Sequence, residues 1–94
     1  MKPSPLSETE VVSRLSSLNA WKLDKGEIVR TFEFANFRDA MAFVNKVAEL
    51  AEVAGHHPDI DIRYNKVKLA LVTHDSGGLT AKDFDLATQI NRAV

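Results

Sequence analysis

Three histidines are the residues of this 94-residue chain best suited to moving protons. His56 and His57 are adjacent and are followed by Pro58, and His74 comes later in the chain. Histidine is the side chain whose ordinary pKa lets it both donate and accept protons near neutral pH. Three imidazoles gathered beside the glycine-containing stretch Gly77-Gly78 would therefore suit acid–base catalysis on a small molecule.

Two other interpretations of the histidines stay open. They could be surface residues at the ends of strands, without a chemical role. Three imidazoles could also bind zinc with one position left for water or substrate. Adjacent residues of an extended chain diverge, however, and the sequence has no His-x-His and no helical His-x-x-x-His pair. The pattern favours proton transfer, and we expect no metal site.

The chain between the histidines predicts a β-hairpin. Apolar and polar residues alternate from Ile60 to Tyr64 and again from Val67 to Thr73. If Asn65-Lys66 is a two-residue loop, Tyr64 faces Val67 and Ile62 faces Leu69. The same register places His57 opposite His74, with Cβ atoms about 4.5–5.5 Å apart. We therefore expect these two histidines to be neighbours on the polar face of the sheet, with His56 pointing elsewhere.

The remaining elements follow from caps and apolar periodicity. A capping box at Ser7–Glu10 begins a first helix, and Trp21 to Phe34 forms a hairpin around Asp24-Lys25-Gly26. Asn36 caps a second helix that Gly55 ends, and a second capping box, Thr80–Asp83, begins the last helix. The apolar stripe of the second helix is Phe37, Ala40, Met41, Val44, Val47, Ala48 and Ala51, and that of the last is Phe84, Ala87, Ile90 and Val94.

This order of elements predicts the fold class. Helix, hairpin, helix, hairpin, helix is α-β-β-α-β-β-α, and tight turns between neighbouring strands make the sheet antiparallel. A sheet with one apolar face needs its helices on that face. We expect an α+β fold with a four-stranded antiparallel sheet, in a single domain over residues 1–94.

Composition excludes several classes of function. The chain has 12 basic and 13 acidic residues and a net charge of −1, which gives no electrostatic case for binding nucleic acid. It has no cysteine, so disulfides and thiolate chemistry are excluded. No apolar run approaches the roughly 20 residues of a membrane span, and the N-terminus does not resemble a signal peptide. We expect a cytoplasmic protein without a membrane partner, and so short a chain would gain stability from oligomerisation.

Further side chains have ordinary interpretations when taken singly. Asp83 closes a capping box, which does not exclude a second role. Glu52 lies one turn before the end of the second helix and would be solvated. Trp21 is the only tryptophan and suits a core.

Taken together, these residues form a motif. Glu52, three residues, His56-His57-Pro58, then Tyr64, His74 and Asp83 resemble the pterin-4a-carbinolamine dehydratase family at every position of its pattern. The likeness also takes in Trp21 and the helix starting at Asn36, so it spans nearly the whole chain.

The resemblance implies the chemistry and the site. The expected activity is loss of water from 4a-hydroxytetrahydropterin, without a cofactor, in the recycling of tetrahydrobiopterin. The catalytic group would be His56, His57, His74 and Asp83. Contacts to the pterin would come from Gly55, His56 and His57 and from Val72, Thr73, His74 and Asp75, with Glu52 and Trp21 at the border.

The resemblance also implies assemblies and leaves alternatives. Family members form dimers that extend the sheet across an edge, often paired into tetramers, so a homodimer or homotetramer is expected. Some act as dimerisation partners of a transcription factor through helix surfaces, which is a second candidate role. A pterin-binding protein without turnover is a third, and the complete set of histidines argues against it.

Overall fold

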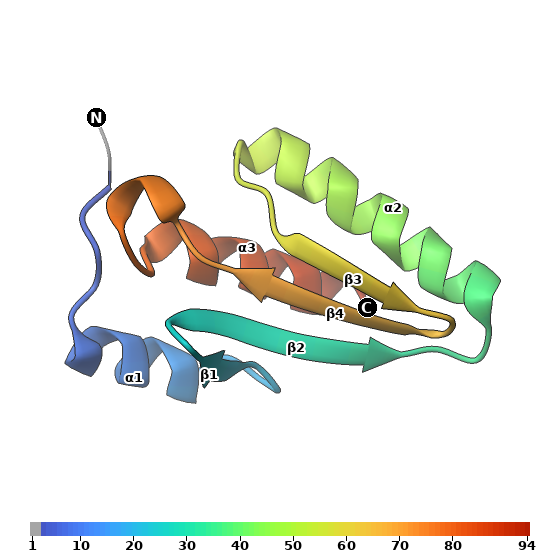
Figure 1. Cartoon of the computed structure of the whole chain (residues 1–94), viewed down its shortest axis with the longest axis horizontal. Helices are drawn as coiled ribbons and strands as arrows, with labels where there is room; N and C mark the ends of the chain where they lie inside the picture. The colour runs from blue at the N-terminus through green and yellow to red at the C-terminus, as the bar shows by residue number, and fades with distance from the viewer. Residues whose placement is uncertain (1–2) are drawn as a thin grey trace.

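The computed structural model describes residues 3–94. The helices and strands labelled in Figure 1 are α1 (Glu8–Ser16), β1 (Lys22–Asp24), β2 (Glu27–Glu33), α2 (Phe37–Ala54), β3 (Asp59–Arg63), β4 (Lys66–Leu71) and α3 (Ala81–Ala93). A short 3-10 helix, η1 (His74–Ser76), lies between β4 and α3. The predicted α+β order is confirmed.

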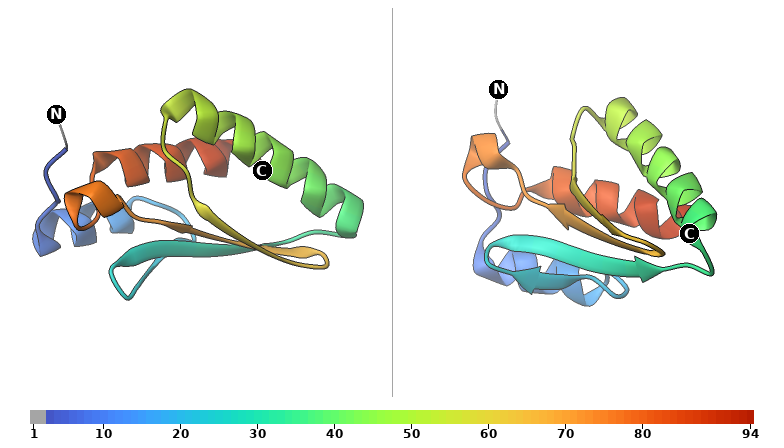
Figure 2. Two further views of the ribbon diagram at one scale, coloured as in Figure 1. Left: turned by 45° about the horizontal axis from the view of Figure 1, so that its top comes forward. Right: turned by 45° about the vertical axis from the view of Figure 1, so that its right-hand side comes forward.

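The four strands form one antiparallel sheet in the order β1-β2-β4-β3. Helices α2 and α3 lie over one face of this sheet (Figure 2). Side chains alternate along β4 as a half-covered sheet requires: Val67, Leu69 and Leu71 are buried beneath the helices, whereas Lys66 and Lys68 are exposed. We call the exposed side, opposite α2 and α3, the open face.

Local signals placed the helix ends correctly. Ser7 and Glu10 form the predicted capping box, and so do Thr80 and Asp83. Asn36 accepts a hydrogen bond from the N–H of Asp39 at the start of α2. Gly55 ends α2 with φ +62°, a left-handed conformation that favours glycine.

The predicted stripe of α2 is wrong in part. Ala40, Val47 and Ala51 are buried as expected, but Phe37 is half exposed and the buried aromatic residue is Phe43. Phe43 packs against Phe32 of β2 and against Phe34, which directly follows that strand, with ring centroids 4.6 and 5.0 Å away. The core of β2 therefore decides which side of the helix turns inward.

The predicted register of the β3–β4 hairpin is wrong. Ile62 pairs with Val67 and Ile60 with Leu69, so the two-residue loop is Tyr64-Asn65 and not Asn65-Lys66. The side-chain amide of Asn65 donates to the carbonyl of Phe34 at 2.7 Å, and the N–H of Phe34 donates to the carbonyl of Asn65 at 2.9 Å. These two bonds tie the loop to the end of β2.

The shift displaces the predicted histidine pair. Continuing the observed register back from Asp59 and Ala70 places residue 57 opposite Val72, not opposite His74. Because the pairing moves by an even number of residues, the apolar side chains keep their face.

Within residues 3–94, no helix is long and apolar enough to cross a membrane.

Candidate active site

One open cavity of about 550 Å³ brings together residues from four parts of the chain. Its walls come from the link between α2 and β3, from the stretch after β4, from the start of α3, and from the segment before α1. The lining residues are Pro3, Gly55, His56, His57, Val72, Thr73, His74, Asp75 and Lys82. All three histidines therefore line the same cavity, although not through the cross-strand pairing that the sequence suggested.

The end of α2 delivers the two adjacent histidines. Gly55 turns the chain with a positive φ, and the N–H of His56 donates back to the carbonyl of Ala51 at 3.1 Å. This pattern caps the last carbonyls of the helix and redirects the backbone toward β3. The peptide after it then carries His56 and His57 along one wall of the cavity.

His56 is held by a buried carboxylate. Its Nε2 lies 2.5 Å from Oδ1 of Asp83, and the His56 side chain is 11% exposed whereas that of Asp83 is fully buried. With the carboxylate as acceptor, Nε2 is the donor, and Nδ1 is then the ring nitrogen left for other partners. The contact fixes both the orientation and the tautomer of His56.

Asp83 is itself fixed by threonines. Its Oδ2 accepts from the backbone N–H of Thr80 at 2.9 Å and from the hydroxyl of Thr73 at 2.8 Å. The two threonine hydroxyls lie 2.8 Å apart. Asp83 thus completes the cap of α3 with one oxygen and holds His56 with the other. The capping role and a role at the site coexist in one side chain.

His57 and Glu52 form an exposed pair. Nε2 of His57 lies 2.5 Å from Oε2 of Glu52, and both side chains are more than half exposed. Glu52 does not line the cavity but reaches it through this contact. The sequence predicted Glu52 near the site only through the family motif, because a solvated glutamate near a helix end carries no local signal.

His74 has different surroundings. It begins η1, directly after Thr73, and is exposed. In residues 3–94 no hydrogen bond or ion pair engages its ring, unlike the rings of His56 and His57. The three imidazoles do not form a common ligand set. The one group within the described residues that could hold a metal is Glu27, Asp59 and His74.

Trp21 is not brought to the cavity. It is 4% exposed, and its Nε1 donates to Oδ1 of Asn91 in α3 at 2.7 Å. The structure thus gives it the core position that its residue type suggests. Conversely, Lys82 and Pro3 line the cavity and were missed. Lys82 lies in the first turn of α3, and the cap at Thr80 fixes where that turn begins beside the cavity.

Comparison with known proteins shows which family the chain belongs to. A profile of the pterin 4 alpha carbinolamine dehydratase family matches residues 4–93. The chain belongs to this family. The resemblance found in the motif of histidines, proline and aspartate is therefore confirmed at the level of the family.

Relatives of the dehydratase family match along most of their length. A protein of Acidobacterium capsulatum is 68% identical over 85 residues, covering 90% of this chain and 92% of the relative. A protein of Chloroflexus aurantiacus is 63% identical over 89 residues, covering 95% and 96%. Both carry the provisional name pterin-4-alpha-carbinolamine dehydratase.

Solved structures share the dehydratase fold. A Brucella melitensis protein described as a transcriptional coactivator/pterin dehydratase superposes with a TM-score of 0.91 at 33% identity, covering 95% of this chain and 97% of that one. A pterin dehydratase-like protein described as a RuBisCO assembly factor of the alpha-carboxysome gives a TM-score of 0.66 at 22% identity, covering 79% and 88%. The second likeness concerns the fold alone.

Proposed function

We propose that this chain is a dehydratase that converts a 4a-hydroxytetrahydropterin into quinonoid dihydropterin and water. The observation that carries the proposal is the gathering of His56, His57 and His74 around one cavity. Its volume of about 550 Å³ lies in the range typical of small-molecule sites. Family membership over nearly the whole chain supports the same activity.

The reaction needs one acid and one base. The C4a–O bond breaks while the leaving oxygen takes a proton, and the N5–H bond gives its proton to a base as N5 forms the double bond to C4a. Atoms balance as quinonoid dihydropterin plus water, and the proton gained by the base restores the acid. Positioned groups of this kind accelerate reactions by about 10²–10⁴-fold each.

The roles of the histidines are part of the proposal. His56 and His74 are the candidate acids, one for each face of the pterin ring, and His57 positions the ring or takes the N5 proton. The buried contact with Asp83 supports the role of His56, because it holds the imidazole still and leaves Nδ1 toward other partners. Gly55, Val72, Thr73 and Asp75 line the same cavity and would contact the pterin.

Single histidine variants test these roles. His56→Gln, His57→Gln and His74→Gln would be mixed with a synthetic 4a-carbinolamine in a stopped-flow instrument and followed by ultraviolet absorbance. We expect kcat to fall at least tenfold in the His56 and His74 variants, and KM or kcat to worsen in the His57 variant. Circular dichroism checks that each variant is folded. Wild-type rates in all three would refute the assignment.

The natural substrate and the cellular setting belong to the same proposal. We propose that the pterin is tetrahydrobiopterin-derived, that no cofactor takes part, and that the reaction takes place in the cytoplasm. The assay with carbinolamines bearing different C6 side chains tests the first point through kcat/KM. A preference of tenfold or more for another side chain would contradict it.

We also propose a homo-oligomer. In residues 3–94 the sheet ends at β1 and at β3, and β3, the longer edge with five residues, carries the half-exposed Ile60 and Ile62. An edge strand with apolar side chains is suited to pairing with a second copy. Sedimentation velocity should give a dimer or tetramer at micromolar concentration, and a monomer throughout would contradict this. Phe37 and Val53, near opposite ends of α2, are also exposed and would be available to a protein partner.

A further inference from the structure

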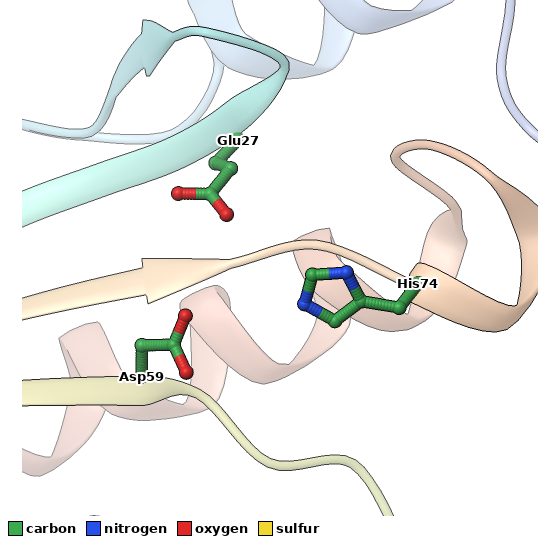
Figure 3. A group of neighbouring side chains, drawn as sticks. All are labelled: Glu27, Asp59 and His74. Atoms are coloured by element: carbon green, nitrogen blue, oxygen red, sulfur yellow. The ribbon is translucent and has the colours of Figure 1, made fainter.

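Glu27, Asp59 and His74 meet at one end of the open face (Figure 3). Glu27 is the first residue of β2, Asp59 is the first of β3, and His74 follows β4, which lies between those two strands. One side-chain ligand atom of each lies within 4.8 Å of the others. Three neighbouring strands therefore bring one imidazole and two carboxylates to a common point.

The side chains of Glu27, Asp59 and His74 are available to bind a cation. Within residues 3–94, no hydrogen bond or ion pair engages any of their side-chain atoms, whereas His56 and His57 each contact a carboxylate at 2.5 Å. Glu27 is half-buried, and the other two are exposed. Two carboxylates this close repel one another, and a shared cation removes that cost.

We propose that Glu27, Asp59 and His74 form a binding site for a divalent transition-metal ion, with Zn²⁺ as the expected occupant. Imidazole nitrogen and carboxylate oxygen are ordinary zinc ligands, and the two carboxylates balance the charge of the ion. Ligand atoms of a tetrahedral zinc site stand about 3.3 Å apart, so the ligand atoms need to approach one another by at most about 1.5 Å. Rotation of the exposed Asp59 and His74 side chains allows that approach, and water completes the coordination.

A second hollow borders two of the three proposed ligands, Glu27 and His74, and gives an ion access to them; Asp59 does not line it. This hollow holds about 360 Å³ and is lined by Glu27 and His74, with Lys25, Val72 and the Gly77-Gly78 stretch around them. Val72 and His74 also line the main cavity, so they form the wall between the two hollows. A metal can thus reach His74 through the second hollow, without entering the main cavity. Lys25 contributes one positive charge near the site, and the two carboxylates of Glu27 and Asp59 outweigh it, so the local charge still favours a cation.

The metal site would regulate the proposed dehydration, and this consequence rests on the proposed function. A ring nitrogen that is bonded to zinc can neither hold nor give a proton. Zinc on one ring nitrogen would therefore keep His74 from forming the doubly protonated imidazolium that the proposed general acid requires, and would slow the reaction while leaving the fold intact. Binding itself does not depend on that activity and is measured without a pterin.

Calorimetric titration of the chelator-treated chain with zinc chloride at neutral pH tests the site. We expect one zinc per chain in the wild type, and affinity weakened at least tenfold in Glu27→Gln, Asp59→Asn and His74→Gln. Asp61→Asn is the matched control, because it removes the same charge from the open face of β3 outside the cluster. It should bind zinc as the wild type does.

The competing location is the His57–Glu52 pair, so Glu52→Gln belongs in the same series. Retained binding in Glu52→Gln supports the proposal. Absence of binding in the wild type overturns it, as does binding that survives Glu27→Gln and Asp59→Asn. In the stopped-flow assay, zinc should inhibit the wild type and Asp61→Asn and spare Glu27→Gln. A wild type without dehydratase activity would defeat the proposed function and leave the calorimetric result standing.

Discussion

Nε2 of His56 lies 2.5 Å from the buried Oδ1 of Asp83, and this contact joins the cap of a helix to the wall of the cavity. Asp83 belongs to the first turn of α3, and His56 follows the end of α2. One carboxylate therefore sets where α3 begins and how the imidazole is oriented. Replacement of Asp83 should therefore lower both the stability of the fold and kcat.

Asp83→Asn tests that coupling. The amide has one oxygen to accept from Thr80 and Thr73 and would turn its NH₂ toward His56, which forces Nε2 to accept and reverses the tautomer. We expect stability to fall by about 1.5–3 kcal/mol and kcat to fall by about 10²-fold. Urea unfolding and the stopped-flow assay measure the two effects.

Asp85→Asn is the control for this experiment. Asp85 lies two residues further along α3, is exposed, and does not line the cavity. Its replacement should leave both stability and kcat close to wild type. Equal losses in the two variants would show that charge on α3, and not the contact with His56, is responsible.

Trp21→Phe should change stability and leave the chemistry alone. The indole N–H donates to Asn91, whose oxygen also accepts from Arg30 at 2.6 Å and so keeps a partner when the indole is gone. We expect a loss of about 1 kcal/mol, or about 4–8 °C in Tm, with unchanged kcat and KM. A raised KM with an unchanged Tm would instead favour the substrate contact that the family resemblance implies for Trp21.

Tyr64→Asn should stabilise the hairpin. Tyr64 has φ +55°, a left-handed conformation that costs an ordinary residue about 1–2 kcal/mol and that asparagine tolerates. Its side chain is 67% exposed, so little packing is lost. Thermal unfolding should show a higher Tm, by a few degrees. Tyr64→Ala keeps the strained backbone conformation, so its Tm should not rise. An equal rise in the Tm of Tyr64→Ala would contradict the explanation.

The stability of α1 should depend on pH through Glu10. The backbone N–H of Ser7 donates to the Glu10 carboxylate, and this bond, followed by the contact with the Ser7 side chain, lowers the pKa of Glu10 below its ordinary value of 4.5. A lowered pKa in the folded state gives stability that is present above 4.5 and is lost as the pH falls through the folded-state value. The difference in Tm between wild type and Glu10→Gln should therefore shrink from about pH 5 to about pH 3. A constant difference would contradict this.

Helix ends could be predicted from the sequence because their causes are local. Ser7 with Glu10, and Thr80 with Asp83, act over three residues, and Gly55 needs only its own backbone freedom. The hairpin register could not be predicted in this way, because the position of the loop depends on a hydrogen bond from Asn65 to Phe34, 31 residues earlier. Alternation alone cannot separate registers that differ by an even number of residues.

The candidate site was likewise predicted only in part from the sequence. The motif identified the three histidines and Asp83, and the structure places all four side chains at or against one cavity. Lys82 was missed because it is an ordinary surface lysine in sequence. The carboxylates beside His74 were missed because Glu27 and Asp59 come from strands 32 residues apart in the chain, and only the sheet order brings them together.

The most direct test of the account is dehydration of a synthetic 4a-carbinolamine by the wild type and by a variant with His56, His57 and His74 all replaced by glutamine. The wild type should accelerate the loss of water at least 10²-fold over the spontaneous rate, and the folded triple variant should return it to that rate. A wild type that gives no acceleration, or a triple variant that keeps it, would contradict the claim that this cavity and its imidazoles carry out the reaction.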